Sequence, residues 1–552
     1  MYAPYRPSYL RFAALLGFLA VAAVGGSVIH PVVGLAPILG IGVVWVVHSV
    51  PIRYPVLVLT YLVLAVDYGP DRPQSGFWPS PLAPIGDLLF TQLNALTKIP
   101  VLRFPLIDGL IFWFLGLAVY RRVTKSPLEP NLPPMPRPLA IMTALTLISI
   151  LAMEFRGLAR GGDFKNSLWQ WHQGAVLPFI VAMYHYALRG PEDWPILSKI
   201  VIAAGITKAL VGSYFALVVV PAMGIEVEYT TSHSDSMTFI FCVLVVLTRF
   251  IEKPKLAHVL RGLGVLAFIV PGMIFNDRRL AYVSLGGCLM AAYLINPWTP
   301  LKRFITRVLP FFVPIIVVYL AIGWNRSGGV WGPAETIRSL IDGQGGEGNL
   351  DYRDLENLNM IATWDQFPIL GTGYGHEFLE PYPLPDISFV FPTYRFHPHN
   401  SLLGLLAFGG LIGYTGVWMY IAGTVYFAVR AYHRSTVSEY RSAALVIVGV
   451  LASYVNQVFG DMGIISYICT FLVAMCVAMA GKLATTTGAW PIPNSALIPP
   501  PARAPEPPPG AIVYSNPGEP PTPAVAVGGG GTTPGSQEAP PPAALRDGSA
   551  TG

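Results

Sequence analysis

The 552-residue chain is 53% hydrophobic and only 12% charged, and its mean hydropathy is +0.54. This composition excludes an ordinary soluble globular protein and is typical of a polytopic membrane protein. The net charge of +5 comes from basic loops between apolar segments, so it gives no reason to expect nucleic-acid binding. The cysteines lie inside apolar runs, without the spacing of a disulfide framework or a metal site. They are Cys242, Cys288, Cys469 and Cys476.

Apolar segments near spanning length recur from residue 11 to residue 481, and they predict an all-α transmembrane bundle of roughly 12 to 14 spans. The first run is followed at once by further segments, so we interpret it as the first helix and not as a cleavable signal. The segments are 11–29, 32–50, 54–67, 106–120, 138–153, 174–188, 200–221, 237–251, 262–275, 280–295, 308–324, 401–427, 442–459 and 463–481.

Basic side chains concentrate in alternate loops, which the positive-inside rule assigns to the cytoplasm together with both termini. The intervening loops are acidic, above all the long loop between the spans ending at 324 and beginning at 401. The basic set is Arg6, Arg11, Arg53, Arg121, Arg122, Lys125, Arg137, Arg189, Lys199, Arg249, Lys253, Lys255, Arg261, Lys302, Arg303, Arg307, Arg430, Arg434 and Arg441.

The long outer loop exceeds what a plain connection needs, which favours a functional role. Residues 351–366 predict a helix that lies on the membrane surface, above the polar residues at the start of the span at 401. Leu355, Leu358, Ala362 and Trp364 would form its apolar stripe. The tail is rich in proline, glycine and alanine and predicts disorder. The predicted domains are an N-terminal bundle (1–324), a periplasmic loop (325–400), C-terminal helices (401–485) and a cytoplasmic tail (486–552).

His397-Pro-His399-Asn400-Ser401 stands at the start of the apolar run at 401. Asn400 or Ser401 is a natural N-cap, which predicts that His399 lies at the N-terminal end of a helix. The helix dipole there disfavours a second proton on the ring and keeps the imidazole able to act as a base. Free backbone N–H groups at the same end suit a phosphate. The alternative is a histidine that only caps the helix among lipid headgroups.

His399-Asn400, nine residues and then Gly410-Leu-Ile-Gly413 resemble the signature of the O-antigen ligase and polysaccharide polymerase family. Upstream residues also resemble the family pattern, over roughly 140 to 480 in all: Arg353, Trp364, Pro368 and Gly371-Thr-Gly373-Tyr-Gly375. The glycine run follows a predicted helix and not a strand, so it favours a tightly folded loop over a nucleotide site. Gly409 and Gly413 predict close packing against a neighbouring helix.

The resemblance implies a base and cations that bind a diphosphate leaving group. His399 is the candidate base, and Arg278 with Arg279, in a very short turn, are the candidate diphosphate ligands. Their alternative is an anchor at the headgroups or a salt bridge with Asp277.

A second family arginine is expected near 222–235, but this sequence has none there. Arg156, Arg160 or Lys208 could supply the missing charge, and we favour Arg160 over Lys208, since Lys208 lies nearer the cytoplasmic half of its span and could snorkel. The supporting candidates are His397, Asn400 and Arg353, together with His233 and Asp235, which could orient the acceptor or be solvated loop residues. His397 and His399 could bind zinc only with further ligands, so we predict no metal and no cofactor.

The resemblance implies a metal-independent, inverting glycosyltransferase of the bacterial inner membrane with a periplasmic active site. Its donor would be an undecaprenyl-diphosphate-linked glycan, and its acceptor another glycan (polymerase) or a lipid A–core sugar (ligase). Partners would include membrane lipid and a chain-length regulator, but no nucleic acid. The rival hypotheses are a lipid-linked-glycan transporter and an inactive scaffold of an envelope polysaccharide complex.

Overall fold

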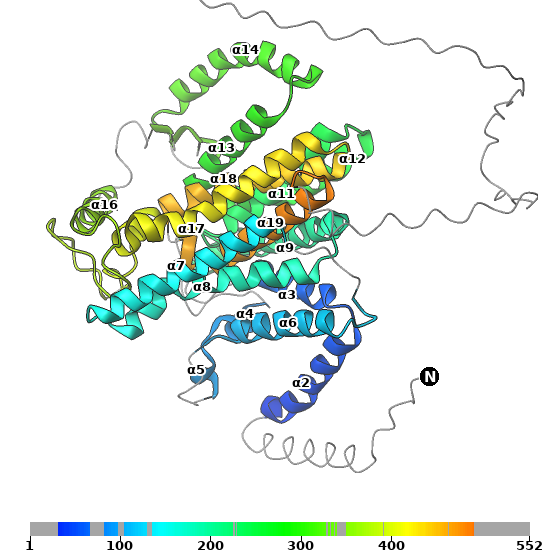
Figure 1. The fold of residues 1–552 in the computed structure, drawn as a ribbon. Coiled ribbons are helices and arrows are strands. Elements are labelled where there is room, and N and C mark those ends of the chain that lie inside the picture. The colour runs from blue at the N-terminus through cyan, green and yellow to red at the C-terminus, as the bar shows by residue number, and fades with distance from the viewer. Residues whose placement is uncertain are drawn as a thin grey trace, which may run out of the picture. The chain divides into compact units, whose positions relative to one another are not determined.

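A computed structural model describes most of the chain between residues 31 and 490, and within that part the secondary structure is α-helical without any strand (Figure 1). The first apolar run at 11–29 and the tail beyond 490 lie outside the described residues. The described ranges are 31–66, 82–97, 104–129, 135–224, 227, 229–326, 329–331, 333–335, 337–338, 349–389, 391–461 and 463–490.

The helices follow the predicted apolar segments closely, and the all-α polytopic architecture is confirmed. The helices of the first half are α2 (Pro31–Ser49), α3 (Arg53–Ala65), α4 (Ala83–Phe90), α5 (Leu93–Thr97), α6 (Leu106–Val123), α7 (Arg137–Ala159), α8 (Phe164–Ala187), α9 (Trp194–Tyr214), α10 (Val220–Met223) and α11 (Asp235–Glu252). Those of the second half are α12 (Leu256–Asn276), α13 (Arg279–Ile295), α14 (Pro300–Gly323), α16 (Asn349–Gln366), α17 (Ser401–Arg434), α18 (Ser438–Gly460) and α19 (Tyr467–Thr486).

Seven helical segments in the described part of the chain are long and apolar enough to cross a membrane. Three shorter apolar helices accompany them, and the total of 12 to 14 spans stays a prediction. The seven are Arg137–Ala159, Pro191–Met223, Leu256–Asn276, Lys302–Gly323, Ser401–Arg434, Ser438–Gly460 and Tyr467–Thr486.

Helix α19 lies at the centre of the bundle, packed against α8, α17 and α18. Its apolar window is 94% buried, whereas that of α14 is 0% buried. A helix that is apolar on every side is stable either inside a bundle or in lipid, because both environments lack water. Helix α19 represents the first case and α14, which stands apart in Figure 1, the second.

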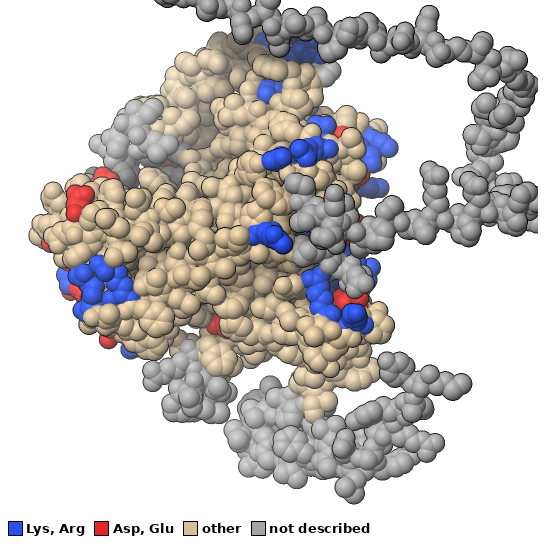
Figure 2. All heavy atoms as spheres, in the orientation of Figure 1, with Lys and Arg blue, Asp and Glu red and all other residues tan. Residues whose placement is uncertain are grey.

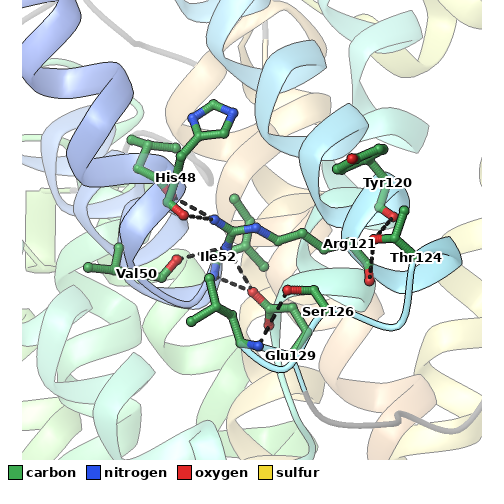
Figure 3. Close-up of polar contacts among 10 residues, drawn as sticks. His48, Val50, Ile52, Tyr120, Arg121, Thr124, Ser126 and Glu129 are labelled. Carbon is green, nitrogen blue, oxygen red and sulfur yellow. Dashed lines mark hydrogen bonds and ion pairs between the residues drawn. The ribbon is translucent and has the colours of Figure 1, made fainter. Parts of the chain in front are cut away.

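Arg121, near the end of α6, closes the turn between α2 and α3 (Figure 3). Its guanidinium donates to the carbonyl oxygens of Val47, His48 and Val50 at 2.7–3.0 Å, and it pairs with Glu129 at 3.1 Å. The carbonyls at the C-terminal end of α2 have no partner within the helix, so the buried arginine satisfies them. The sequence predicted only that Arg121 belongs to a basic loop, whereas the structure shows that it stabilises the turn between α2 and α3.

Helix α17 is interrupted at Gly410, where φ is +57° and the backbone is not helical. The loop that follows α16 replaces the missing hydrogen bonds. Thr372 and Gly373 donate to the carbonyls of Ala407 and Phe408, and the amides after Gly410 donate to the carbonyls of Pro368 and Ile369, all at 2.8–3.1 Å. These hydrogen bonds pair backbone groups that the break frees, as a broken helix inside a membrane requires.

The glycine run of this loop fits between α17 and α7. Gly371, Gly373 and Gly375 all have positive φ, which confirms the expectation of a tightly folded loop. A Cβ on Gly373 would lie 2.3 Å from the backbone of Gly157 in α7. Close packing along α17 is also confirmed, since a Cβ on Gly409 would lie 2.3 Å from the sulfur of Met153.

Candidate functional site

His399 and the buried carboxylate of Glu356 form a histidine–carboxylate pair at the N-terminal end of α17. The Nδ1 atom of His399 lies 3.2 Å from both carboxylate oxygens, and its backbone N–H donates to Oε2 at 3.0 Å. The Glu356 side chain is 1% exposed, whereas that of His399 is 24% exposed. With the proton on Nδ1, the ring donates to Glu356 and leaves Nε2 as the acceptor, which is the arrangement of a general base with a fixed orientation.

Helix α16 brings Glu356 to this place by burying a polar face. Thr363 accepts the backbone N–H of Leu379, and Asn359 exchanges hydrogen bonds with the backbone of Tyr382. The predicted apolar stripe is therefore wrong at Leu358, which is 43% exposed. The helix turns its polar side inward because that side organises the loop that ends at His399. The buried side chains are Tyr352, Glu356, Asn359, Met360 and Thr363.

Asn400 is the N-cap of α17, as the sequence predicted. Its side-chain oxygen accepts the amides of Leu402 and Leu403 at 3.2 Å each. His399 therefore precedes the cap directly, and its ring packs edge-on against Tyr352 at 5.9 Å. Helix α17 fixes the backbone of the histidine while α16 fixes its ring.

Asp461 follows the end of α18, and its contacts bring further candidate residues close to the His399–Glu356 pair. Its carboxylate lies 3.4 Å from Nδ1 of His233, and its carbonyl accepts the Ser401 hydroxyl at 3.3 Å. Arg353, one helical turn before Glu356, donates to the carbonyl of Gly460 at 3.2 Å. His399, Arg353 and His233 thus lie around the same end of α18.

Arg278 continues this group on the side of α12 and α13. Helix α12 ends at Asn276, Asp277 adopts φ +47°, and Arg278 is the N-cap of α13, so the very short turn is confirmed. Asparagine and aspartate tolerate that conformation better than most residues. The Arg278 guanidinium lies 3.7 Å from the ring centre of Tyr229, whose ring is 6.2 Å from that of His233. The side chain of Arg279 lies outside the described residues.

Arg160 and Arg156 lie at the end of α7, on the other side of the glycine run. Arg156 donates to the carbonyl of Gly371 at 2.8 Å, and the exposed Arg160 stacks on the ring of Phe367 at 4.4 Å. The structure shows no direct contact between Arg160 and His399. Arginine on an aromatic ring keeps its hydrogen-bond donors for another partner, so Arg160 stays a candidate for the diphosphate.

Asp235 and Lys208 form a buried ion pair of their own. The Lys208 ammonium lies 3.3 Å from Oδ2 of Asp235, and the exposed fractions of the two side chains are 2% and 0%. Lys208 therefore does not snorkel, as the sequence left open, because its charge is paired inside the bundle. Asp235 also accepts the backbone N–H of Ser232 at 2.9 Å. The pair stabilises the turn that carries His233.

His397 points away from His399. Its Nδ1 contacts the Thr393 hydroxyl at 3.0 Å, and its ring stacks with Phe391. Burial lowers the pKa of this imidazole to about 4, because the charged ring would lose its hydration. A small cavity beside it is lined in part by Gln170 and Tyr374. In the part of the chain that the structure describes, no three His, Cys, Asp or Glu side chains are arranged to hold a metal ion.

Glu356 and Asp461 are the site residues that sequence reasoning missed. Both fall in segments that the sequence assigns to the acidic outer face of the membrane, and both are far from His399 along the chain. One signal was available for Glu356. It falls on the predicted helix three residues after Arg353, so both should lie on one face of that helix.

The fold and site together define an all-helical polytopic membrane protein with a histidine–carboxylate pair at one end of its bundle. Residues 264–418 match a family model described as O-Antigen ligase. This segment begins within α12 and ends within α17, so it contains the Arg278 turn, Glu356 and His399. The chain therefore carries an O-antigen ligase family domain. No curated protein matches the chain in sequence.

Proposed function

We propose that the protein is a membrane glycosyltransferase that transfers or polymerises a glycan from an undecaprenyl-diphosphate carrier. The observation that carries this proposal is the pairing of His399 with the buried carboxylate of Glu356 at the capped end of α17. Such a pair suits removal of a proton from an acceptor hydroxyl. The O-antigen ligase match supports the choice of reaction.

In the proposed reaction, Nε2 of His399 takes the hydroxyl proton as the acceptor oxygen attacks the anomeric carbon of the donor. The new bond joins that carbon to the acceptor oxygen, and the bond to the phosphate oxygen breaks on the opposite side. The anomeric configuration is therefore inverted. Glu356 stabilises the imidazolium that forms, and the proton passes from it to solvent. No metal takes part in this scheme.

Arginines bind the diphosphate as its charge develops. Arg278 is our first candidate, because the aromatic contact of Tyr229 connects it to His233 beside Asp461. Arg160 and Arg279 are the further candidates, and His233 and Arg353 are proposed to hold the acceptor. The charge bias of the loops supports a periplasmic position for this end of the bundle.

The test is transfer of glycan by the purified full-length protein in detergent. His399→Ala should lower the rate of transfer by at least about a hundredfold, at unchanged protein level. His433→Ala is the matched control, because His433 is an exposed histidine at the other end of α17. Full activity of His399→Ala would exclude the proposed base.

Incubation with donor alone separates the two acceptor classes, since a polymerase lengthens the donor and a ligase does not. The transporter hypothesis predicts movement of lipid-linked glycan across vesicles that is insensitive to His399→Ala. The scaffold hypothesis predicts neither transfer nor transport.

A further inference from the structure

A cavity lies at the end of the bundle opposite His399. It has a volume of about 240 Å³ and lies between α9, α11, α12 and α18. Helices α11 and α18 each have one end beside the candidate site, at Asp235 and Gly460, and the other end at this cavity. At 1.5 Å per residue, their 18 and 23 residues extend for roughly 30 Å, which is the thickness of the bilayer hydrocarbon. The cavity thus lies at the opposite membrane surface.

One part of the lining is apolar and is formed by helices from two sides. It includes Trp194 and Ile202 of α9 and Val246 and Val265 of α11 and α12. Helices α11 and α12 approach closely behind it, since a Cβ on Gly262 would lie 2.6 Å from the side chain of Val246. This part is suited to a hydrocarbon chain and offers nothing to a small hydrophilic ion.

The other part of the lining is cationic. Its two carboxylates are already engaged, because Glu252 pairs with Arg441 at 2.8 Å and Glu439 pairs with Lys253 at 3.1 Å. Arg249 donates to the hydroxyl of Ser198 at 3.0 Å. Among the residues that the structure describes, no carboxylate lies within ion-pair distance of Arg249 or of the exposed Arg261, although Glu439 acts electrostatically on Arg249.

We propose that this cavity binds an anionic phospholipid of the bilayer, with its phosphate between Arg249 and Arg261 and an acyl chain along Ile202 and Val265. A phosphate next to a hydrocarbon chain matches both parts of the lining at once. A zwitterionic lipid such as phosphatidylcholine offers its phosphate together with a cation that the arginines would repel, and a free phosphate leaves the apolar part empty. Basic pockets between helices at a membrane surface commonly take such headgroups.

The test measures lipid binding and not transfer, so it is independent of the proposed reaction. Phosphatidylglycerol and phosphatidylcholine are titrated onto the full-length protein in detergent and followed by native mass spectrometry. Phosphatidylglycerol should bind more tightly, and Arg249→Gln and Arg261→Gln should each weaken it roughly fivefold. Arg430→Gln removes the same charge at the same end of the bundle, outside the cavity, and should bind like the wild type.

Equal affinity for the two lipids, or an Arg249→Gln/Arg261→Gln protein that binds like the wild type, would overturn the proposal. Inorganic phosphate provides a second arm. If it raises the thermal unfolding temperature as much as phosphatidylglycerol does, the arginines bind a free anion and the lipid assignment fails. Should the double variant not fold, Val265→Trp keeps both arginines and fills the apolar part. It should weaken phosphatidylglycerol binding, and unchanged affinity would contradict the proposal.

Discussion

The two ends of the bundle use their charged side chains differently. At the end away from His399, four cations are paired with carboxylates: Arg53 with Asp193, Arg121 with Glu129, Lys253 with Glu439 and Arg441 with Glu252. The arginines of the cavity, Arg249 and Arg261, are the exceptions at that end. At the His399 end, Arg353 and Arg156 contact carbonyl oxygens and Arg160 contacts a ring. Arg395, paired with Glu380, and Lys208, paired with Asp235, are exceptions there. Figure 2 shows basic side chains at both sides of the molecule, with a mostly uncharged surface between them.

This difference separates structural from functional charge. A cation held by a carboxylate is neutralised, and removing it exposes a buried negative charge. A cation held by a carbonyl or a ring keeps its net charge, which an anionic substrate can use. Arg353, Arg156 and Arg160 at the His399 end therefore keep the positive charge that the proposed diphosphate donor would use, although the loops around them are acidic overall.

Replacing one arginine at each end should sharpen this comparison most. Arg121→Met should destabilise the protein by about 3–5 kcal/mol, because it leaves Glu129 buried without its partner. Arg156→Met should cost only about 1 kcal/mol, since a single hydrogen bond to a carbonyl is lost. Thermal and denaturant unfolding in detergent measure both. Equal losses would contradict the distinction between the two ends.

The break in α17 should be nearly as sensitive. A Cβ on Gly410 would lie 2.4 Å from the carbonyl carbon of Ile369, and the residue has positive φ. Gly410→Ala should therefore lower the free energy of unfolding by about 3 kcal/mol. Gly264→Ala is the control, because a Cβ there meets nothing within 4 Å and alanine favours a helix. A stable Gly410→Ala protein would mean that the break can straighten.

Glu356→Gln should affect the reaction more than the fold. The amide can keep its contact with Nδ1 of His399, but it has no charge to stabilise the imidazolium. We expect transfer to slow by about a hundredfold, as a fall in kcat with little change in KM, at an unchanged unfolding temperature. Glu377→Gln, on the loop that follows α16 and about half exposed, should transfer like the wild type. Normal kcat in Glu356→Gln would exclude the positioning role.

The smallest effect concerns pH and His397. Its pKa is near 4 in the folded protein and near 6.5 in the unfolded chain. Between these values the unfolded chain binds more protons, so stability falls as the pH decreases from about 6.5 towards 4. At pH 5.5 the loss is about 1 kcal/mol.

The check is a difference between variants. His397→Gln should remove this part of the pH dependence, so the gap between the unfolding free energies of variant and wild type should change between pH 7 and 5.5. If the difference in unfolding free energy between variant and wild type stays constant, protonation of the His397 ring does not destabilise the folded protein.

Local sequence predicted the helices, a cap at Asn400 or Ser401 and the tight fold of the glycine run, since hydropathy, capping and glycine chemistry all act over a few residues. It did not predict Glu356 or Asp461 as partners, because those contacts depend on how α16 and α18 pack against α17. It was wrong at Leu358 for a similar reason. The helix turns its polar side to the loop, and no pattern within the helix itself reveals that neighbour.

The loop after α16 hydrogen-bonds to the backbone on both sides of the break in α17. This arrangement restricts where residues can be inserted into the chain. One residue inserted between Asn400 and Gly410 would rotate the cap by about 100° relative to the gap, so His399 would turn away from Glu356. One residue added between Gly375 and His397 would only lengthen a loop whose two ends are already held in place. Length variation should therefore be tolerated on one side of His399 and not on the other.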